Sequence, residues 1–186
     1  MTTLSPERIK LISKASSLIL RHRPDLVGLE QLPAGGWVST ERLLRALNRR
    51  FKVSREELDY VVRENDKQRF SYSASGTHIR ANQGHSVPVD LGLQPATPPG
   101  VLFHGTVDRS IASIRTDGLS KMARHAVHLS VDIATASNVG SRRGNPVILT
   151  IDSARMAADG HIFYLSDNGV WLTDSVPSEY ISFPTA

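Results

Sequence analysis

A proline-rich stretch at residues 87–100, VPVDLGLQPATPPG, restricts this chain more than any other feature, because it holds four prolines and two glycines. Proline fixes φ and has no N–H to donate, so neither a helix nor a central strand continues through such a stretch. The chain has 186 residues, enough for two small lobes. We therefore expect one lobe at residues 1–86, a linker at 87–100 and a second lobe at 101–186.

The first lobe is expected to hold three helices followed by a β-hairpin. Helix start signals stand at Ser5, at Ser39 and at the capping box that begins at Ser54. Pro24 is expected to end the first helix near residue 23. Alternating apolar residues around a Ser-Ala-Ser-Gly turn predict the hairpin at residues 70–80. This is the element order of a winged helix, which by itself does not establish function.

The second lobe has the pattern of a β-rich α+β domain. Asp108 is expected to cap a short helix that Gly118 ends. The remaining segments are connected without long βαβ crossovers, and the chain contains neither GxGxxG nor GxxxxGK[ST], which argues against a Rossmann domain. We expect strands at 101–103, 127–129, 147–151, 162–165 and 170–173, and short helices at 133–139 and 153–158.

Positive charge is concentrated in the first half of the chain. Residues 1–85 hold 15 Lys and Arg against 9 Asp and Glu, whereas residues 86–186 hold 7 against 9. Arginine supplies 17 of the 22 cations, and its guanidinium group grips phosphate with two N–H donors. The first lobe is therefore the better candidate to contact a nucleic acid, although an excess of this size also suits a solvated surface.

Three basic residues lie on the first predicted helix. Lys14 and Arg21 are two turns apart and point the same way, and His22 follows at the helix end. They form either a solvated face, with cations favourably placed near a helix C-terminus, or a phosphate clamp with a histidine that exchanges protons. Arg69 and Arg124 are further candidates, each equally consistent with an exposed arginine.

Two polar segments follow predicted apolar strands of the second lobe. His104-Gly105-Thr106 ends the first strand, and the glycine there allows a ligand to approach the backbone closely. His128-Leu129-Ser130 repeats the pattern at a second strand end and offers imidazole and hydroxyl groups for a ribose or carboxamide. Together they predict a polar pocket, although a histidine beside a strand is more often structural.

Several function classes are excluded or disfavoured. The chain has no cysteine, so it forms no disulfide and has no thiolate nucleophile or ligand. The seven histidines show neither HxxxH nor HExxH, so we expect no metal site. No GxSxG motif is present, and neither a secretory signal nor an apolar run of membrane-spanning length is visible. We expect a cytoplasmic, monomeric protein without membrane contact.

Eight segments in order along the chain, from about residue 8 to the C-terminus, together match one known family. The chain resembles the NAD-dependent RNA 2′-phosphotransferases, the tRNA-splicing 2′-phosphotransferase family. The matching segments are ISKASSLILRHRP, GGWVS, KQRFSY, IRANQGHS, LFHGT, KMARHAVHLSVD, VGSRRGNPVIL and YLSDNGVWLT. One departure is Ala15, where the family usually has leucine.

The resemblance implies a winged-helix RNA-binding lobe, an ADP-ribosyltransferase-like NAD-binding lobe and a two-step reaction. An internal RNA 2′-phosphate attacks C1″ of the nicotinamide ribose of NAD and expels nicotinamide. The ribose O2″ then attacks phosphorus, which releases 2′-hydroxyl RNA and ADP-ribose 1″,2″-cyclic phosphate. NAD is thus a co-substrate, and the RNA partner carries a splice-junction-like 2′-phosphate.

The resemblance also implies roles for individual residues. The family's catalytic Arg-His-Arg-Arg set falls on Arg21, His22, Arg69 and Arg124, and Lys14 would help these arginines to hold the RNA phosphate. The NAD-contacting positions fall on His104, Gly105, Thr106, His128, Ser130, Arg142 and Val170.

Two alternatives remain at this stage. One is an ADP-ribosyltransferase that acts on the terminal phosphates of nucleic acids or on a protein. The other is a non-catalytic winged-helix protein that binds nucleic acid and has a degenerate second lobe. Absence of NAD binding would favour the second alternative.

Overall fold

The computed structural model describes residues 3–65, 67–122, 124–141 and 144–184, and the chain divides into two compact units, Met1–Gly92 and Leu93–Ala186. Each unit has its own hydrophobic core. The proline-rich stretch contributes to both: Val87 and Val89 pack on the core of the first unit, and Ala96 packs on that of the second. Helices and antiparallel strands are mixed in both units, which makes the chain an α+β protein.

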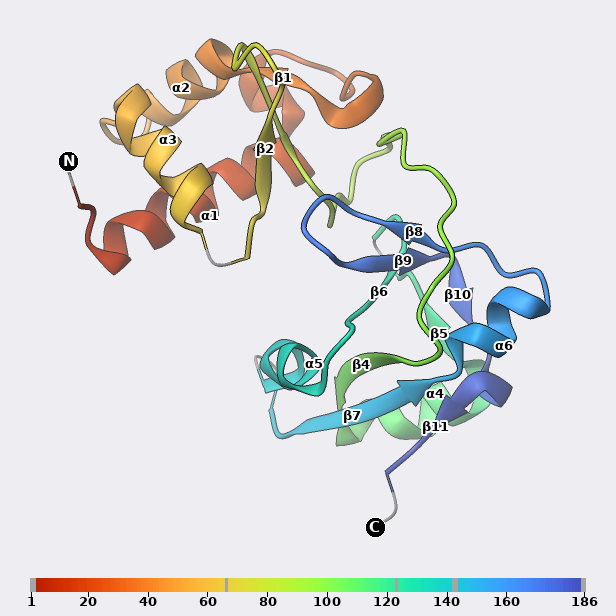
Figure 1. Ribbon diagram of the computed structural model, residues 1–186. Coiled ribbons are helices and arrows are strands. Elements are labelled where there is room, and N and C mark those ends of the chain that lie inside the picture. The colour runs from red at the N-terminus through yellow and green to blue at the C-terminus, as the bar shows by residue number, and fades with distance from the viewer. Residues whose placement is uncertain (1–2, 66, 123, 142–143, 185–186) are drawn as a thin grey trace. The chain divides into compact units, whose positions relative to one another are not determined.

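The first unit consists of three α-helices and a three-stranded antiparallel sheet with the strand order β1-β3-β2 (Figure 1). Two short 3₁₀ helices follow α1 along the chain. The elements are α1 (Pro6–His22), η1 (Pro24–Val27), η2 (Ala34–Gly36), β1 (Val38–Ser39), α2 (Thr40–Asn48), α3 (Arg55–Glu64), β2 (Phe70–Tyr72) and β3 (His78–Ala81).

The helix boundaries predicted for this unit are confirmed. The side chains of Ser5, Ser39 and Ser54 accept hydrogen bonds from the first turns of α1, α2 and α3. Helix α1 ends at His22, two residues before Pro24. Local sequence fixes these ends because each cap satisfies backbone N–H groups that have no partner within the helix.

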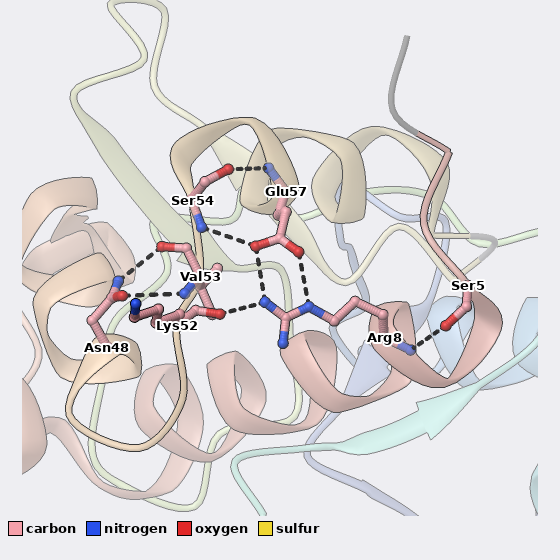
Figure 2. Close-up of polar contacts among 7 residues, drawn as sticks. All are labelled: Ser5, Arg8, Asn48, Lys52, Val53, Ser54 and Glu57. Carbon is pink, nitrogen blue, oxygen red and sulfur yellow. Dashed lines mark hydrogen bonds and ion pairs between the residues drawn. The ribbon is translucent and has the colours of Figure 1, made fainter.

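A polar network joins the starts of α1 and α3 (Figure 2). Arg8 of α1 binds the Glu57 carboxylate with Nε at 2.8 Å and Nη2 at 2.9 Å, and Nη2 also donates to the carbonyl of Lys52. The same carboxylate accepts from the backbone N–H of Ser54 at 3.0 Å and so completes the α3 capping box. The Arg8 guanidinium therefore lowers the pKa of Glu57 below its usual range.

A second polar cluster attaches β2 to α3. The Tyr72 hydroxyl donates to Asp59 Oδ1 at 2.6 Å, and Arg55 Nε donates to the same oxygen at 2.7 Å. Burial of the phenol and its hydrogen bond to Asp59 both raise the pKa of Tyr72, so the neutral phenol persists far into the alkaline range.

In its described residues, the second unit contains three small antiparallel sheets and three short α-helices (Figure 1). Their strand orders are β11-β7-β4, β6-β9-β8 and β10-β5. The elements are β4 (Leu102–Val107), η3 (Asp108–Ser110), α4 (Ile111–Asp117), β5 (Leu119–Ser120), β6 (Val127–Leu129), α5 (Ile133–Gly140), β7 (Pro146–Ile151), α6 (Ser153–Ala158), β8 (Tyr164–Leu165), β9 (Trp171–Thr173), β10 (Ser175–Val176), η5 (Ser178–Tyr180) and β11 (Ile181–Ser182).

Several local predictions for this unit are wrong. The strand expected at 101–103 begins only at Leu102 and continues to Val107, and Val101 is exposed. Asp108 does not cap α4, because a 3₁₀ turn comes first and Ser110 precedes the helix. The strand expected at 162–165 begins only at Tyr164, because Phe163 uses its carbonyl to pair with Ala96. Val170 lies outside β9, in a turn closed by Ser166. Each difference comes from a partner that is distant in sequence or from a turn.

The part of the chain that the structure describes contains no helix both long and apolar enough to cross a membrane.

Candidate functional site

The predicted basic residues of α1 lie on the side of the helix that faces away from the core and at its C-terminal end. Ile12 and Ile19 are fully buried or nearly so, whereas Lys14 and His22 are exposed and Arg21 is half-buried. Arg21 and His22 occupy the last turn of α1, where the helix dipole favours cations. The Arg21 guanidinium, and not the carbonyl-bearing helix end itself, is the group here that can bind an anion.

The segment after β3 fixes the end of α1. His22 Nδ1 lies 2.8 Å from the Ser86 hydroxyl oxygen, and the backbone N–H of Ser86 donates to the carbonyl of Arg21 at 3.0 Å. The first contact orients the imidazole ring from its Nδ1 side, and the second attaches the backbone of Ser86 to the last turn of α1. Ser86 was not among the predicted site residues, although it lies in the family-like segment IRANQGHS.

Gly84 lies directly against the guanidinium of Arg21. Its φ of +84° is in the left-handed region, and a Cβ placed there would lie 3.5 Å from Arg21 Nη1 and 3.6 Å from its Cζ. The positive φ is what favours glycine here, because a Cβ at these distances would make only ordinary van der Waals contact with the arginine. The sequence indicated Gly84 only as a glycine in the family-like segment IRANQGHS. Its contact with Arg21 could not be predicted from sequence spacing.

Arg69 is anchored to α1 through buried polar groups. Its Nη1 donates to Ser13 Oγ and to Asn65 Oδ1, each at 3.3 Å. Ser13 and Asn65 are 4% and 2% exposed and are joined by a hydrogen bond of 3.0 Å. Burial of these partners restricts the guanidinium more than a surface contact would.

Arg69 also adjoins the segment that holds the end of α1. Its carbonyl accepts from the backbone N–H of Asn82 at 2.9 Å, at the start of the same segment that reaches Arg21 and His22. The first unit thus connects three of the predicted catalytic residues, Arg21, His22 and Arg69, through α1 and residues 82–86.

In the second unit, His104 lies in the middle of β4, not at its end as predicted. Its register partner is Leu149 of β7, and β4 continues to Val107. Its Nδ1 lies 3.0 Å from the His128 carbonyl oxygen, which only accepts, so Nδ1 donates. In the neutral ring, Nε2 is then the acceptor.

Ser130 joins β4 to the end of β6. Its backbone exchanges two hydrogen bonds of 2.8 Å with Phe103. Since Leu129 pairs with Trp171, Ser130 stands one step beyond that pair, opposite Val170 in the continued register. Two residues predicted to contact NAD, His104 on β4 and Ser130 after β6, therefore lie on adjoining segments of this unit.

Arg124 is exposed and lies beside His128. Its Nη1 is 3.4 Å from His128 Nδ1, and because guanidinium only donates, that nitrogen accepts. The neutral His128 ring therefore carries its proton on Nε2 and presents a donor there, opposite to His104.

Gly105 has a packing role that the sequence did not indicate. A Cβ at this position would lie 1.8 Å from the carbonyl oxygen of Ala136, so the backbone of α5 fills the space that we expected a ligand to use. The neighbouring Thr106 pairs with Val147 in β7. A contact of either residue with NAD remains a prediction.

Val170 is held by the turn before β9. Ser166 Oγ donates to its carbonyl at 2.9 Å and accepts from its N–H at 3.1 Å.

Arg142, also predicted to contact NAD, lies outside the described residues. Among the described residues, no group of three or more His, Asp or Glu side chains is arranged to hold one metal ion.

Comparison with known proteins gives one consistent result. Residues 7–175 match the model of the family described as "RNA 2'-phosphotransferase, Tpt1 / KptA family". The chain is 53% identical to a probable RNA 2′-phosphotransferase of Nostoc punctiforme over 179 residues, covering 96% of this chain and 98% of that protein. It is 52% identical to a protein of the same description from Streptomyces coelicolor over 182 residues, covering 97% and 98%. A third, from Trichormus variabilis, is 54% identical over 171 residues and covers 91% and 93%.

Proposed function

The chain belongs to the RNA 2′-phosphotransferase family, and we propose that it transfers an internal RNA 2′-phosphate to NAD with the residues described above. The observation that carries this proposal is the family match over residues 7–175, which includes every predicted site residue from Lys14 to Val170. The transferase activity on RNA follows from membership of the family. The use of NAD and the roles of individual residues belong to the proposal.

We assign residues 1–86 to a winged-helix RNA-binding lobe and residues 101–186 to an ADP-ribosyltransferase-like lobe that binds NAD, with 87–100 as the linker. Three helices followed by a hairpin that pairs with a short strand before α2 support the first assignment. The contact of His104 with the His128 carbonyl and the bridge between Phe103 and Ser130, which together join β4 to the end of β6, support the second.

In the first step, an oxygen of the RNA 2′-phosphate forms a bond to C1″ of the nicotinamide ribose while the bond from C1″ to nicotinamide breaks. The phosphate is already an anion, so this step needs positioning and charge stabilisation more than a base. We propose that Lys14, Arg21 and Arg69 hold the phosphate, and that Arg124 is the fourth phosphate-directed residue. A transferase that acts on a weakly nucleophilic acceptor would need a carboxylate at the position of Val170. Because the phosphate is already an anion, an apolar residue is acceptable there.

In the second step, the ribose O2″ attacks phosphorus and the bond from phosphorus to the RNA 2′-oxygen breaks. The O2″ proton leaves, and the RNA oxygen gains a proton to become a 2′-hydroxyl. The products are the RNA and ADP-ribose 1″,2″-cyclic phosphate. We propose that the Nε2 atom of His22 takes part in this proton transfer from O2″ to the RNA 2′-oxygen, while its Nδ1 atom is engaged by Ser86. Guanidinium groups stabilise the negative charge that builds on the phosphoryl oxygens.

For NAD, we propose that His104 contributes a hydrogen-bond acceptor at Nε2, as its Nδ1 contact requires of the neutral ring. An acceptor there matches the O–H of a ribose or the N–H of a carboxamide. His128, whose Nε2 is buried, positions the His104 ring through its carbonyl oxygen.

The test uses an oligoribonucleotide with one internal 2′-phosphate, incubated with the protein with and without NAD and in the presence of EDTA. We expect NAD-dependent formation of 2′-hydroxyl RNA and ADP-ribose cyclic phosphate. Release of nicotinamide with no loss of RNA phosphate would instead indicate another acceptor. No reaction and no NAD binding would overturn the proposal in favour of a nucleic-acid-binding protein.

The His22→Ala variant tests the division into steps. It should still form the ADP-ribosylated 2′-phosphate but accumulate it, because the second step loses its proton-transfer group. Immediate conversion to 2′-hydroxyl RNA at the wild-type rate would remove His22 from the mechanism.

A further inference from the structure

A row of three arginines lies along α2, apart from every residue used in the mechanism above. Arg42, Arg45 and Arg49 are spaced by three and four residues and so lie on one side of the helix, next to the buried Ala46. With residues 25–28 of the η1 segment, they line a surface pocket of about 270 Å³.

The charge of this pocket is poorly compensated. Within the described ranges, no carboxylate lies at ion-pair distance from Arg42 or Arg49. Arg45 has one contact of 3.6 Å with Glu41, and both side chains are largely exposed. The one acidic residue in the lining, Asp25, is held by Arg23 at 2.8 Å. Three guanidinium groups are thus accompanied by two carboxylates, Asp25 and Glu41, of which Asp25 is already paired with Arg23.

Helix stability does not account for the whole row. Arg45 and Arg49 lie at the C-terminal end of α2, where the helix dipole favours a cation. Arg42 lies in the first turn, where the dipole disfavours a cation. The position of Arg42 beside the other two is therefore not accounted for by the helix dipole.

The pocket is close along the chain to the proposed phosphate-binding end of α1. Asp25, at its edge, follows His22 by three residues, so their Cα atoms lie within about 11 Å of each other. An RNA whose 2′-phosphate is held at Arg21 and His22 therefore has its neighbouring nucleotides within reach of α2.

The rim of the pocket argues for a chain that crosses the surface. It consists of exposed arginines around a volume of about 270 Å³. Arginine binds phosphate through paired N–H donors and needs no base sequence to do so.

We propose that Arg42, Arg45 and Arg49 bind the phosphodiester backbone of the RNA next to the 2′-phosphate. This row gives the enzyme a preference for longer RNA and contributes to RNA affinity rather than to chemistry. The inference rests on the proposed function, because it assigns the neighbouring RNA to a site whose 2′-phosphate is held at the end of α1.

The experiment compares wild type with the double variant Arg42→Gln/Arg49→Gln, without NAD so that no turnover occurs. Fluorescence anisotropy gives Kd for a labelled 20-nucleotide RNA and for a trinucleotide, both with one internal 2′-phosphate, over a range of salt concentrations. Each phosphate neutralised on a single strand contributes about 0.7 to the salt slope, so the variant should lose about 1.4 in slope and, at 0.1 M salt, on the order of 25-fold in affinity for the long RNA.

The matched control is Arg63→Gln/Arg109→Gln, which removes two exposed arginines elsewhere and leaves the net charge equal to that of the test variant. Trinucleotide binding and kcat should be unchanged in both variants. Equal salt slopes for the test variant and the control would overturn the proposal. Failure of wild type to remove the 2′-phosphate in the presence of NAD would instead refute the function on which it rests, so the two failures are distinguishable.

Discussion

Replacing Ser86 by alanine isolates one contact of the proposed proton-transfer residue. The Ser86 hydroxyl is 2.8 Å from His22 Nδ1, and alanine removes it. The backbone N–H of Ser86, which donates to the Arg21 carbonyl at 3.0 Å, is retained. Since Ser86 is exposed, the substitution leaves no buried cavity. The effect should therefore be confined to the orientation of the imidazole ring.

The magnitude follows from the loss of one hydrogen bond. Such a bond contributes about 0.5–1.5 kcal/mol, which corresponds to roughly a 2- to 12-fold slower second step. Removal of a general acid or base costs about 100- to 10,000-fold, so Ser86→Ala should stay well above His22→Ala in rate. The first step needs no base and should keep its rate.

Single-turnover reactions on a 2′-phosphorylated oligonucleotide separate the two steps. The RNA, its ADP-ribosylated intermediate and the 2′-hydroxyl product are resolved over time, and we expect transient accumulation of the intermediate in Ser86→Ala. Ser86→Thr keeps the hydroxyl and should restore the second step. The control Ser113→Ala removes an exposed hydroxyl that contacts only the Ser110 carbonyl among its identified partners. An unchanged second step in Ser86→Ala, or a Thr variant as slow as the Ala variant, would refute this reasoning.

Three further outcomes follow from other contacts. Arg8 lowers the pKa of Glu57 in the folded protein. The ion pair therefore stabilises the fold fully above the ordinary glutamate pKa of about 4.3, and this stabilisation is lost as the pH falls through the lower native pKa. In chemical unfolding, the stabilities of wild type and Glu57→Gln should differ at pH 7 and converge in acid. Gly105→Ala should lower the free energy of unfolding by about 1–3 kcal/mol, because its Cβ meets the α5 backbone, whereas Gly100→Ala, with nothing within 4 Å, should not; equal thermal unfolding of both would contradict the packing role. His104→Ala should raise the Kd for NAD about tenfold by calorimetry with RNA affinity unchanged, and an unchanged Kd would remove His104 from the NAD site.

The sequence determined what depends on neighbouring residues. Serine caps and Pro24 placed the ends of the helices in the first unit, and the Ser-Ala-Ser-Gly turn placed its hairpin, because these signals act over one turn of backbone. The family-like segments likewise identified Arg21 and His22 at the end of α1, since that motif is contiguous.

Tertiary structure decided the contacts between residues distant in sequence. Short strands such as β5 and β10 have too few residues for a periodic pattern and exist only because they pair with each other. Ser86 reaches His22 across 64 residues, and Arg69 reaches Ser13 across 56. Gly105, which suggested a ligand, instead makes room for α5. A local pattern carries no information on which distant backbone fills such a space, because packing of the whole unit determines it.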